Sequence, residues 1–192
     1  MNVIAFNGSP NRDGNTYRLI RHTLDAIEKE GITTELVQIG GTNVRPCTAC
    51  GKCFENADRQ CIQDNDMVNE CITKMVKADA IIIGTPTYFS GVTPEIKAFM
   101  DRAFFVAKAN GDLFRQKVGA GIAAERRSGA VCAVDCINHY FGISGMFSAG
   151  SRYWNNAKGL QPGDVESDEE GIDTMKQLGE NIAWFIRQIH QK

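Results

Sequence analysis

Short apolar runs alternate with segments of helical periodicity along the whole chain. Apolar runs at residues 2–6, 78–84 and 118–124 and an alternating pattern at 34–39 predict four strands, and a fifth is expected near residues 148–154. Spacings of three and four predict helices from about residue 16 to 31, from about 64 or 66, from about 94, and within 131–146. The final helix has the clearest stripe, formed by Ile172, Met175, Leu178, Ile182, Ile186 and Ile189. This alternation predicts an α/β domain with a parallel sheet.

Length and charge limit what this domain can be. A chain of 192 residues predicts one domain over 1–192, with a long cysteine-rich insertion at about 41–63 and a surface loop at 158–170. The formal net charge of −2 gives no basic footprint for nucleic acid. No run reaches membrane-spanning length and the first residues lack a signal-peptide pattern, so we expect a cytoplasmic protein without a membrane partner.

Three loops leave the carboxyl ends of the predicted strands, where open parallel sheets bind ligands. The first loop, NGSPNRDGNT, combines hydroxyls and amides with the free N–H groups of a helix start. This pattern predicts a cradle for an anion such as phosphate, although a well-capped polar turn is the alternative. The loop is not of the ATP type, because no Gly-Lys-Ser/Thr follows. The candidate anion ligands are Ser9, Asn11, Asn15 and Thr16.

The second and third loops carry aromatic and charged side chains. In PTYFSG, Tyr88 and Phe89 favour a flat ligand, with local packing as the alternative. In the third loop, Glu125 and Arg126 precede Gly129, and they either meet an acidic or aromatic ligand or are solvated. The sequence GAGIAA at 119–124 matches a dinucleotide fingerprint, but its glycines fall inside a predicted strand, so we interpret them as packing residues.

Four of the seven cysteines lie within fifteen residues, with the spacing C-x₂-C-x₂-C-x₇-C. An odd total argues against a purely disulfide framework. Three cysteines at successive x₂ intervals favour a cuboidal iron–sulfur cluster, while zinc and free thiols remain open alternatives. Cys71 falls on an apolar helical stripe, and the scattered histidines suggest no catalytic role. The candidate metal ligands are Cys47, Cys50, Cys53 and Cys61.

Together, the stretches GSPNRDGNT, DAIIIGTPTYFSGVTPEIKAFMDR and the closing DEEG-initiated helix resemble the NADPH-dependent FMN reductase family of flavodoxin-like proteins. The cysteine loop is similar to that of the family's iron–sulfur flavoprotein branch. The resemblance implies a doubly wound, three-layer fold with a five-stranded sheet in order 2-1-3-4-5. It also implies an FMN phosphate held by Ser9, Asn11, Asn15 and Thr16. The isoalloxazine would be flanked by Pro86, Thr87, Tyr88, Phe89, Ser90 and Gly91, with Glu125, Arg126 and Gly129 near its polar edge.

We therefore expect an FMN-dependent oxidoreductase in which the flavin carries the chemistry and no side chain acts as a catalytic acid or base. The expected partners are NAD(P)H, an unspecified electron acceptor and further copies of the chain in a homodimer or homotetramer. A 4Fe–4S cluster is the cofactor expected at the cysteines. A non-enzymatic flavodoxin- or ferredoxin-like carrier and a zinc-stabilised interaction module are the alternative functions.

Overall fold

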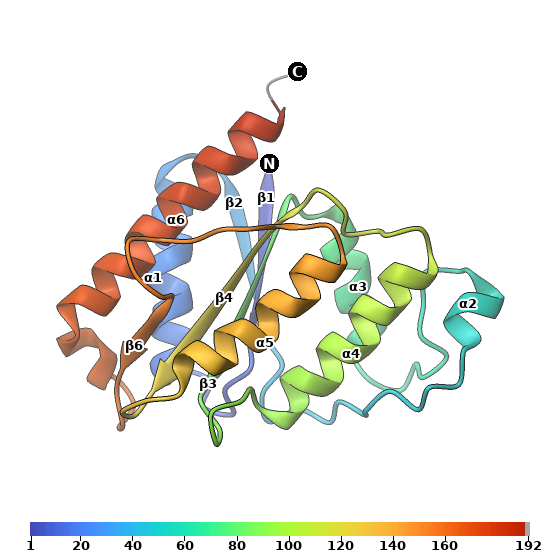
Figure 1. Cartoon of the computed structure of the whole chain (residues 1–192), viewed down its shortest axis with the longest axis horizontal. Helices are drawn as coiled ribbons and strands as arrows, with labels where there is room; N and C mark the ends of the chain where they lie inside the picture. The colour runs from blue at the N-terminus through green and yellow to red at the C-terminus, as the bar shows by residue number, and fades with distance from the viewer. Residues whose placement is uncertain (191–192) are drawn as a thin grey trace.

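The computed structural model describes residues 1–190, and a parallel sheet forms its centre (Figure 1). Its order is β2-β1-β3-β4-β5, as expected, and a short sixth strand also pairs with β4. In the register of the sheet, Asn7 lies opposite both Gln38 and Gly84, so β1 and β2 end level with one another and β3 runs two residues further, to Pro86. The strands are β1 (Asn2–Asn7), β2 (Thr33–Gln38), β3 (Ala80–Pro86), β4 (Val118–Glu125), β5 (Phe147–Ser148) and β6 (Asn156–Lys158).

Helices cover both faces of this sheet and give the expected three layers (Figure 1). Alternate residues of each strand point to opposite faces. Val3 and Ala5 of β1 pack with one pair of helices, whereas Ile4 and Phe6 pack with the other three. The first face carries α1 (Asn15–Lys29) and α6 (Glu169–His190), and the second carries α3 (Val68–Lys77), α4 (Pro94–Ala109) and α5 (Ala130–Ile143).

The fifth strand differs from the prediction near residues 148–154. Two short strands replace it: β5 pairs with the start of β4 and β6 pairs with its end. The segment between them bonds to β4 at its two ends, where Ala149 N–H donates to the Gly119 carbonyl (2.8 Å) and Ala123 N–H donates to the Asn155 carbonyl (3.0 Å), and it bonds to itself in between. Ser151 Oγ donates to the side chain of Asn155 (2.7 Å), whose Nδ2 donates to the carbonyl of Ala149 (3.4 Å). Such local side-chain bonds compete with a continuous ladder.

Two connections contain structure that the periodicity did not predict. The expected surface loop at 158–170 holds a 3₁₀ helix, η1 (Asp164–Ser167), because Val165 is fully buried in the core beneath α1 and α6. The cysteine-rich insertion contains the short helix α2 (Lys52–Asn56), which lies beside α4 at the periphery (Figure 1). No helix within residues 1–190 combines the length and apolar character that a membrane span requires.

Candidate functional site

The loop after β1 is fixed by its own polar groups. Gly8 N–H donates to the carbonyl of Gly84 (2.8 Å), which holds the loop against β3. Asn7 Oδ1 accepts from Ser9 N–H (3.0 Å), and Ser9 Oγ accepts from Asn11 N–H (3.2 Å). These bonds bend the chain sharply before α1 and leave the first turn of that helix facing the carboxyl end of the sheet.

The start of α1 has unused hydrogen-bonding capacity. Gly14 precedes the helix and no side chain caps it, so the N–H groups of its first turn are left for a ligand or solvent. Thr16 is 1% exposed, and its buried Oγ1 atom has no hydrogen-bond partner among residues 1–190. An unpaired buried hydroxyl costs roughly 1–3 kcal/mol. A phosphate at this helix start would relieve that cost and meet the positive end of the helix dipole.

A cleft of about 240 Å³ opens at this point, at the carboxyl ends of the strands. It brings together eight of the predicted ligand residues from all three loops, and it adds a fourth segment at 159–162. The lining residues are Ser9, Asn11, Gly14, Asn15, Thr16, Pro86, Thr87, Tyr88, Ala124, Arg126, Gly159, Leu160 and Pro162.

The fourth segment was missed because it follows β6, which the sequence pattern did not resolve. Asn15 Oδ1 accepts from Gly163 N–H (2.8 Å), which ties the segment to the start of α1. A Cβ at Gly159 would lie 2.7 Å from Asn15 Nδ2, so a side chain at position 159 would push the Asn15 amide away from Gly163. Two glycines and a proline in GLQPG were the available signal for a tight turn at the site.

Phe89, Ser90 and Gly91 do not line the cleft. They form a tight turn at its rim, in which Tyr88 and Gly91 exchange backbone hydrogen bonds of 2.9 and 2.8 Å. Phe89 and Ser90 have φ of +48° and +63°, and the Phe89 ring is fully exposed. Phe89 therefore does not pack under the next helix. A left-handed conformation costs such a residue about 1 kcal/mol or more, which is typical of functional turns.

Glu125 and Gly129 shape the site without lining it. Glu125 is buried, and its carboxylate accepts from Ala130 N–H (2.9 Å) and from Asn156 Nδ2 (3.0 Å). It thereby fastens the start of α5 to β6. Gly129 has φ of +98°, and a Cβ on it would lie 2.7 Å from Ser90 Oγ. The aromatic turn thus rests directly on the backbone that begins α5.

The four clustered cysteines line one small cavity beside α4, together with Arg102 and other residues. All four are free thiols, and Cys53 is the buried one. Burial raises the pKa of the Cys53 thiol, and the nearby Cys61 and Cys47 add to that effect. Within residues 1–190, no three acidic, histidine or cysteine side chains lie close enough together to coordinate one metal ion. One zinc ion would need sulfurs at about 2.3 Å from a common point, whereas a cluster of several irons spreads its ligands more widely.

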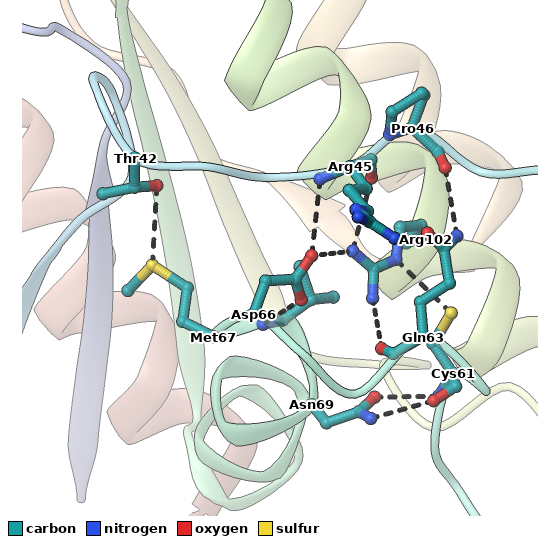
Figure 2. A network of polar contacts seen from close by, with 10 residues as sticks. Thr42, Arg45, Pro46, Cys61, Gln63, Asp66, Met67, Asn69 and Arg102 are labelled. Carbon is teal, nitrogen blue, oxygen red and sulfur yellow. Dashed lines mark hydrogen bonds and ion pairs between the residues drawn. The ribbon is translucent and has the colours of Figure 1, made fainter.

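Arg102 is the functional candidate that the sequence interpretation missed (Figure 2). It lies on α4 and is 1% exposed. Its Nε donates to Cys61 Sγ (3.3 Å), its Nη1 to the Arg45 carbonyl (3.3 Å) and its Nη2 to the Gln63 carbonyl (2.6 Å). Nη1 also forms an ion pair with Asp66. A charged residue three positions after Phe99, on the buried stripe of α4, was the signal in the sequence.

Asp66 and Asn69 complete this network (Figure 2). Burial by itself raises the pKa of the Asp66 carboxyl, but hydrogen bonds from Arg102 and Val68 N–H outweigh it, so the pKa lies below its usual value. Asn69 binds Cys61 twice: its Oδ1 accepts from Cys61 N–H (2.8 Å) and its Nδ2 donates to the Cys61 carbonyl (2.9 Å). The backbone of the fourth cysteine is therefore held independently of its sulfur.

The remaining thiols and imidazoles do not join either cavity. Cys71 is buried in the core as expected, and burial raises its pKa to about 12. Cys132 is exposed on α5. His22 and His190 contact single carboxylates at the surface, 2.8 Å from Glu166 and 2.9 Å from Asp79 respectively.

The chain is similar to known proteins over most of its length. Residues 1–161 match a family model described as NADPH-dependent FMN reductase. An iron–sulfur flavoprotein of Methanocaldococcus jannaschii is 36% identical, over 98% of this chain and 99% of the relative. An iron–sulfur flavoprotein of Methanosarcina thermophila is 29% identical, over 100% of this chain and 98% of the relative.

Solved structures share the fold at low sequence identity. RosB with a bound 8-demethyl-8-formylriboflavin-5'-phosphate has a TM-score of 0.74 at 17% identity, covering 100% of this chain and 81% of that one. A WrbA-like flavodoxin from Agrobacterium tumefaciens has a TM-score of 0.65 at 17% identity, covering 97% of both chains. These likenesses show a flavodoxin-like fold.

Proposed function

Since the chain belongs to the NADPH-dependent FMN reductase family, we propose that its carboxyl-end cleft is the FMN site and its cysteine cavity a 4Fe–4S site. The protein is an FMN-dependent oxidoreductase, with a nicotinamide as electron source and a separate electron acceptor.

The phosphate of FMN is proposed to bind at the start of α1. The strongest support is the buried Thr16 hydroxyl without a partner, next to the uncapped first turn of the helix. Ser9, Asn11 and Asn15 line the same end of the cleft and supply further neutral donors. A phosphate is well served by such donors because each bond to it is charge-assisted.

The isoalloxazine is proposed to lie against the loop after β3. Pro86, Thr87 and Tyr88 line the cleft there, and the turn at Phe89, Ser90 and Gly91 forms its rim. Arg126 lines the opposite side, while Glu125 and Gly129 support it from behind. When bound, FMN supplies the hydride and electron chemistry. The chain then needs only to bind and orient the ring, so no side chain is assigned as acid or base.

The cysteine cavity is proposed to hold one 4Fe–4S cluster, which would supply one-electron transfer. Cys47, Cys50, Cys53 and Cys61 all line it, and the other three thiols of residues 1–190 do not. The curated relatives are named as iron–sulfur flavoproteins, which supports the assignment.

We also propose a cytoplasmic homo-oligomer. Free thiols throughout residues 1–190 support a reducing compartment. Phe54 and Phe105 are both exposed and meet edge to face, with ring centroids 5.2 Å apart, beside the cysteine cavity. Exposed aromatic pairs of this kind are typical of contact surfaces between chains. Light scattering on the FMN-loaded protein measures the assembly.

Anaerobic reconstitution with iron and sulfide tests the cluster. Wild type is expected to take up about four irons per chain, while Cys53→Ser is expected to lose that uptake. Cys71→Ser is the matched control, because this thiol is buried in the core and lies outside the cavity. Zinc uptake without iron would favour a structural zinc site. A wild type that binds neither metal would leave a flavin reductase with free thiols.

A further inference from the structure

We propose that the buried ion pair of Asp66 and Arg102 tunes the reduction potential of the group held by the four cysteines. This inference rests on the proposed 4Fe–4S site. Arg102 acts on that site through Cys61, the only one of the four thiols within residues 1–190 to which a charged side chain donates. Arg102 is thus a positioning and tuning residue and takes no part in turnover itself.

Every nitrogen of the Arg102 guanidinium donates to the cysteine insertion or to Asp66, which follows it (Figure 2). Its side chain has 0% exposure, and that of Asp66 has 4%. Two of its nitrogens are fixed by Asp66 and by backbone carbonyls of the insertion. The third nitrogen, Nε, is thereby aimed at Cys61 Sγ, 3.3 Å away. A planar group with five donors can hold this orientation in a way that a lysine cannot.

Holding Cys61 in place does not require the positive charge of Arg102. Asn69 already fixes the backbone of Cys61, because Asn69 Oδ1 accepts from the Cys61 N–H and Asn69 Nδ2 donates to the Cys61 carbonyl. A neutral donor on α4 would serve the remaining bonds to the carbonyls of Arg45 and Gln63. Burying a cation and an anion costs desolvation free energy that a neutral hydrogen-bonding side chain would not require. The charges therefore point to an electrostatic role at the sulfur.

The two charges act on electron addition with opposite signs. A cation beside a cysteine ligand stabilises the extra negative charge of the reduced cluster, and a carboxylate on the far side of that cation opposes it. Water screens both charges weakly because neither side chain is exposed. Removing the positive member should lower the reduction potential, and removing the negative member should raise it.

The test is a potentiometric titration of the anaerobically reconstituted protein, with the cluster followed by electron paramagnetic resonance. Arg102→Gln is expected to shift the midpoint potential negative and Asp66→Asn positive. The double variant should lie between Arg102→Gln and wild type, because Arg102 is the nearer charge to the sulfur and has the larger effect. A loop that merely loosened would move both single variants in the same direction. Lys108→Gln and Asp112→Asn remove the charges of an exposed pair near the end of α4, and both are expected to leave the potential unchanged.

The outcomes separate this inference from the function on which it rests. A wild type that takes up no iron overturns the cluster and the inference together. A wild type with a cluster, but with shifts that are absent or of the same sign, overturns the tuning role alone. If Arg102→Gln loses its cluster, the sign measured for Asp66→Asn decides: a positive shift supports the tuning role, and no shift or a negative one contradicts it.

Discussion

The hydroxyl of Thr16 is the most informative single group at the cleft where we propose that FMN binds. Its residue is almost fully buried in the first turn of α1, yet its oxygen has no partner in the described part of the chain. Thr23, two turns later on the same helix, is also buried, but its hydroxyl has a partner, because it donates to the Leu19 carbonyl (3.1 Å). Folding therefore leaves this hydroxyl to be satisfied by a bound ligand or by solvent.

Thr16→Val is expected to weaken FMN binding by roughly 10- to 100-fold, because a charge-assisted hydrogen bond to phosphate is worth about 1.5–3 kcal/mol. Valine keeps the shape of the side chain, so thermal stability should change little. Thr23→Val is the control, with the same substitution on the same helix and no predicted effect on the flavin. Fluorescence titration of apoprotein with FMN measures both, and equal affinities in the two variants would refute the phosphate assignment.

At the scale of elements, the site depends on how α5 begins. Gly129 lies in the left-handed region directly before this helix, and the turn carrying Phe89 and Ser90 rests on it. Glu125 fixes the same helix start to β6. The rim of the cleft is thus positioned by contacts between elements, and a side chain at Gly129 would disturb the rim from outside the cleft.

Gly129→Ala is expected to lower the free energy of unfolding by about 1–2 kcal/mol through its left-handed backbone. It should also weaken FMN binding, because the new Cβ would lie 2.7 Å from Ser90 Oγ. Gly31→Ala is the matched control: its φ is +75°, and a Cβ there meets nothing within 4 Å. Denaturant unfolding and FMN titration separate the two effects. An FMN affinity equal to that of Gly31→Ala would show that the rim does not contact the flavin.

Strands β1, β3 and β4 could be predicted from the sequence because they are apolar runs covered on both faces, and the edge strand β2 because its residues alternate. The edge next to β4 could not, since there the side chains of Ser151 and Asn155 bond within the segment and split the strand. Eight of the predicted flavin ligands line the cleft. The fourth lining segment, residues 159–162, was not predicted because it follows β6, a strand that the sequence pattern did not indicate. Arg102 went unrecognised because its ion pair joins residues 36 positions apart, a pairing that local patterns do not encode.

At the scale of the whole molecule, one chain carries two separate candidate redox sites. The cleft lies at the carboxyl ends of the strands. The cysteine cavity is lined by residues of α4 and α2, two helices that lie side by side at the periphery (Figure 1). The two sets of lining residues have no member in common. A plain flavin reductase needs only the first site, so the number of electrons that a chain can store distinguishes the two accounts.

Anaerobic titration of the reconstituted protein with dithionite measures that number directly. FMN accepts two electrons and a 4Fe–4S cluster one, so wild type is expected to consume about three electrons per chain. Cys53→Ser, which retains the flavin cleft, is expected to consume about two, and Cys71→Ser about three. A wild type that takes up only about two electrons, with its flavin fully reduced, would contradict the assignment of a second redox group to the cysteine cavity.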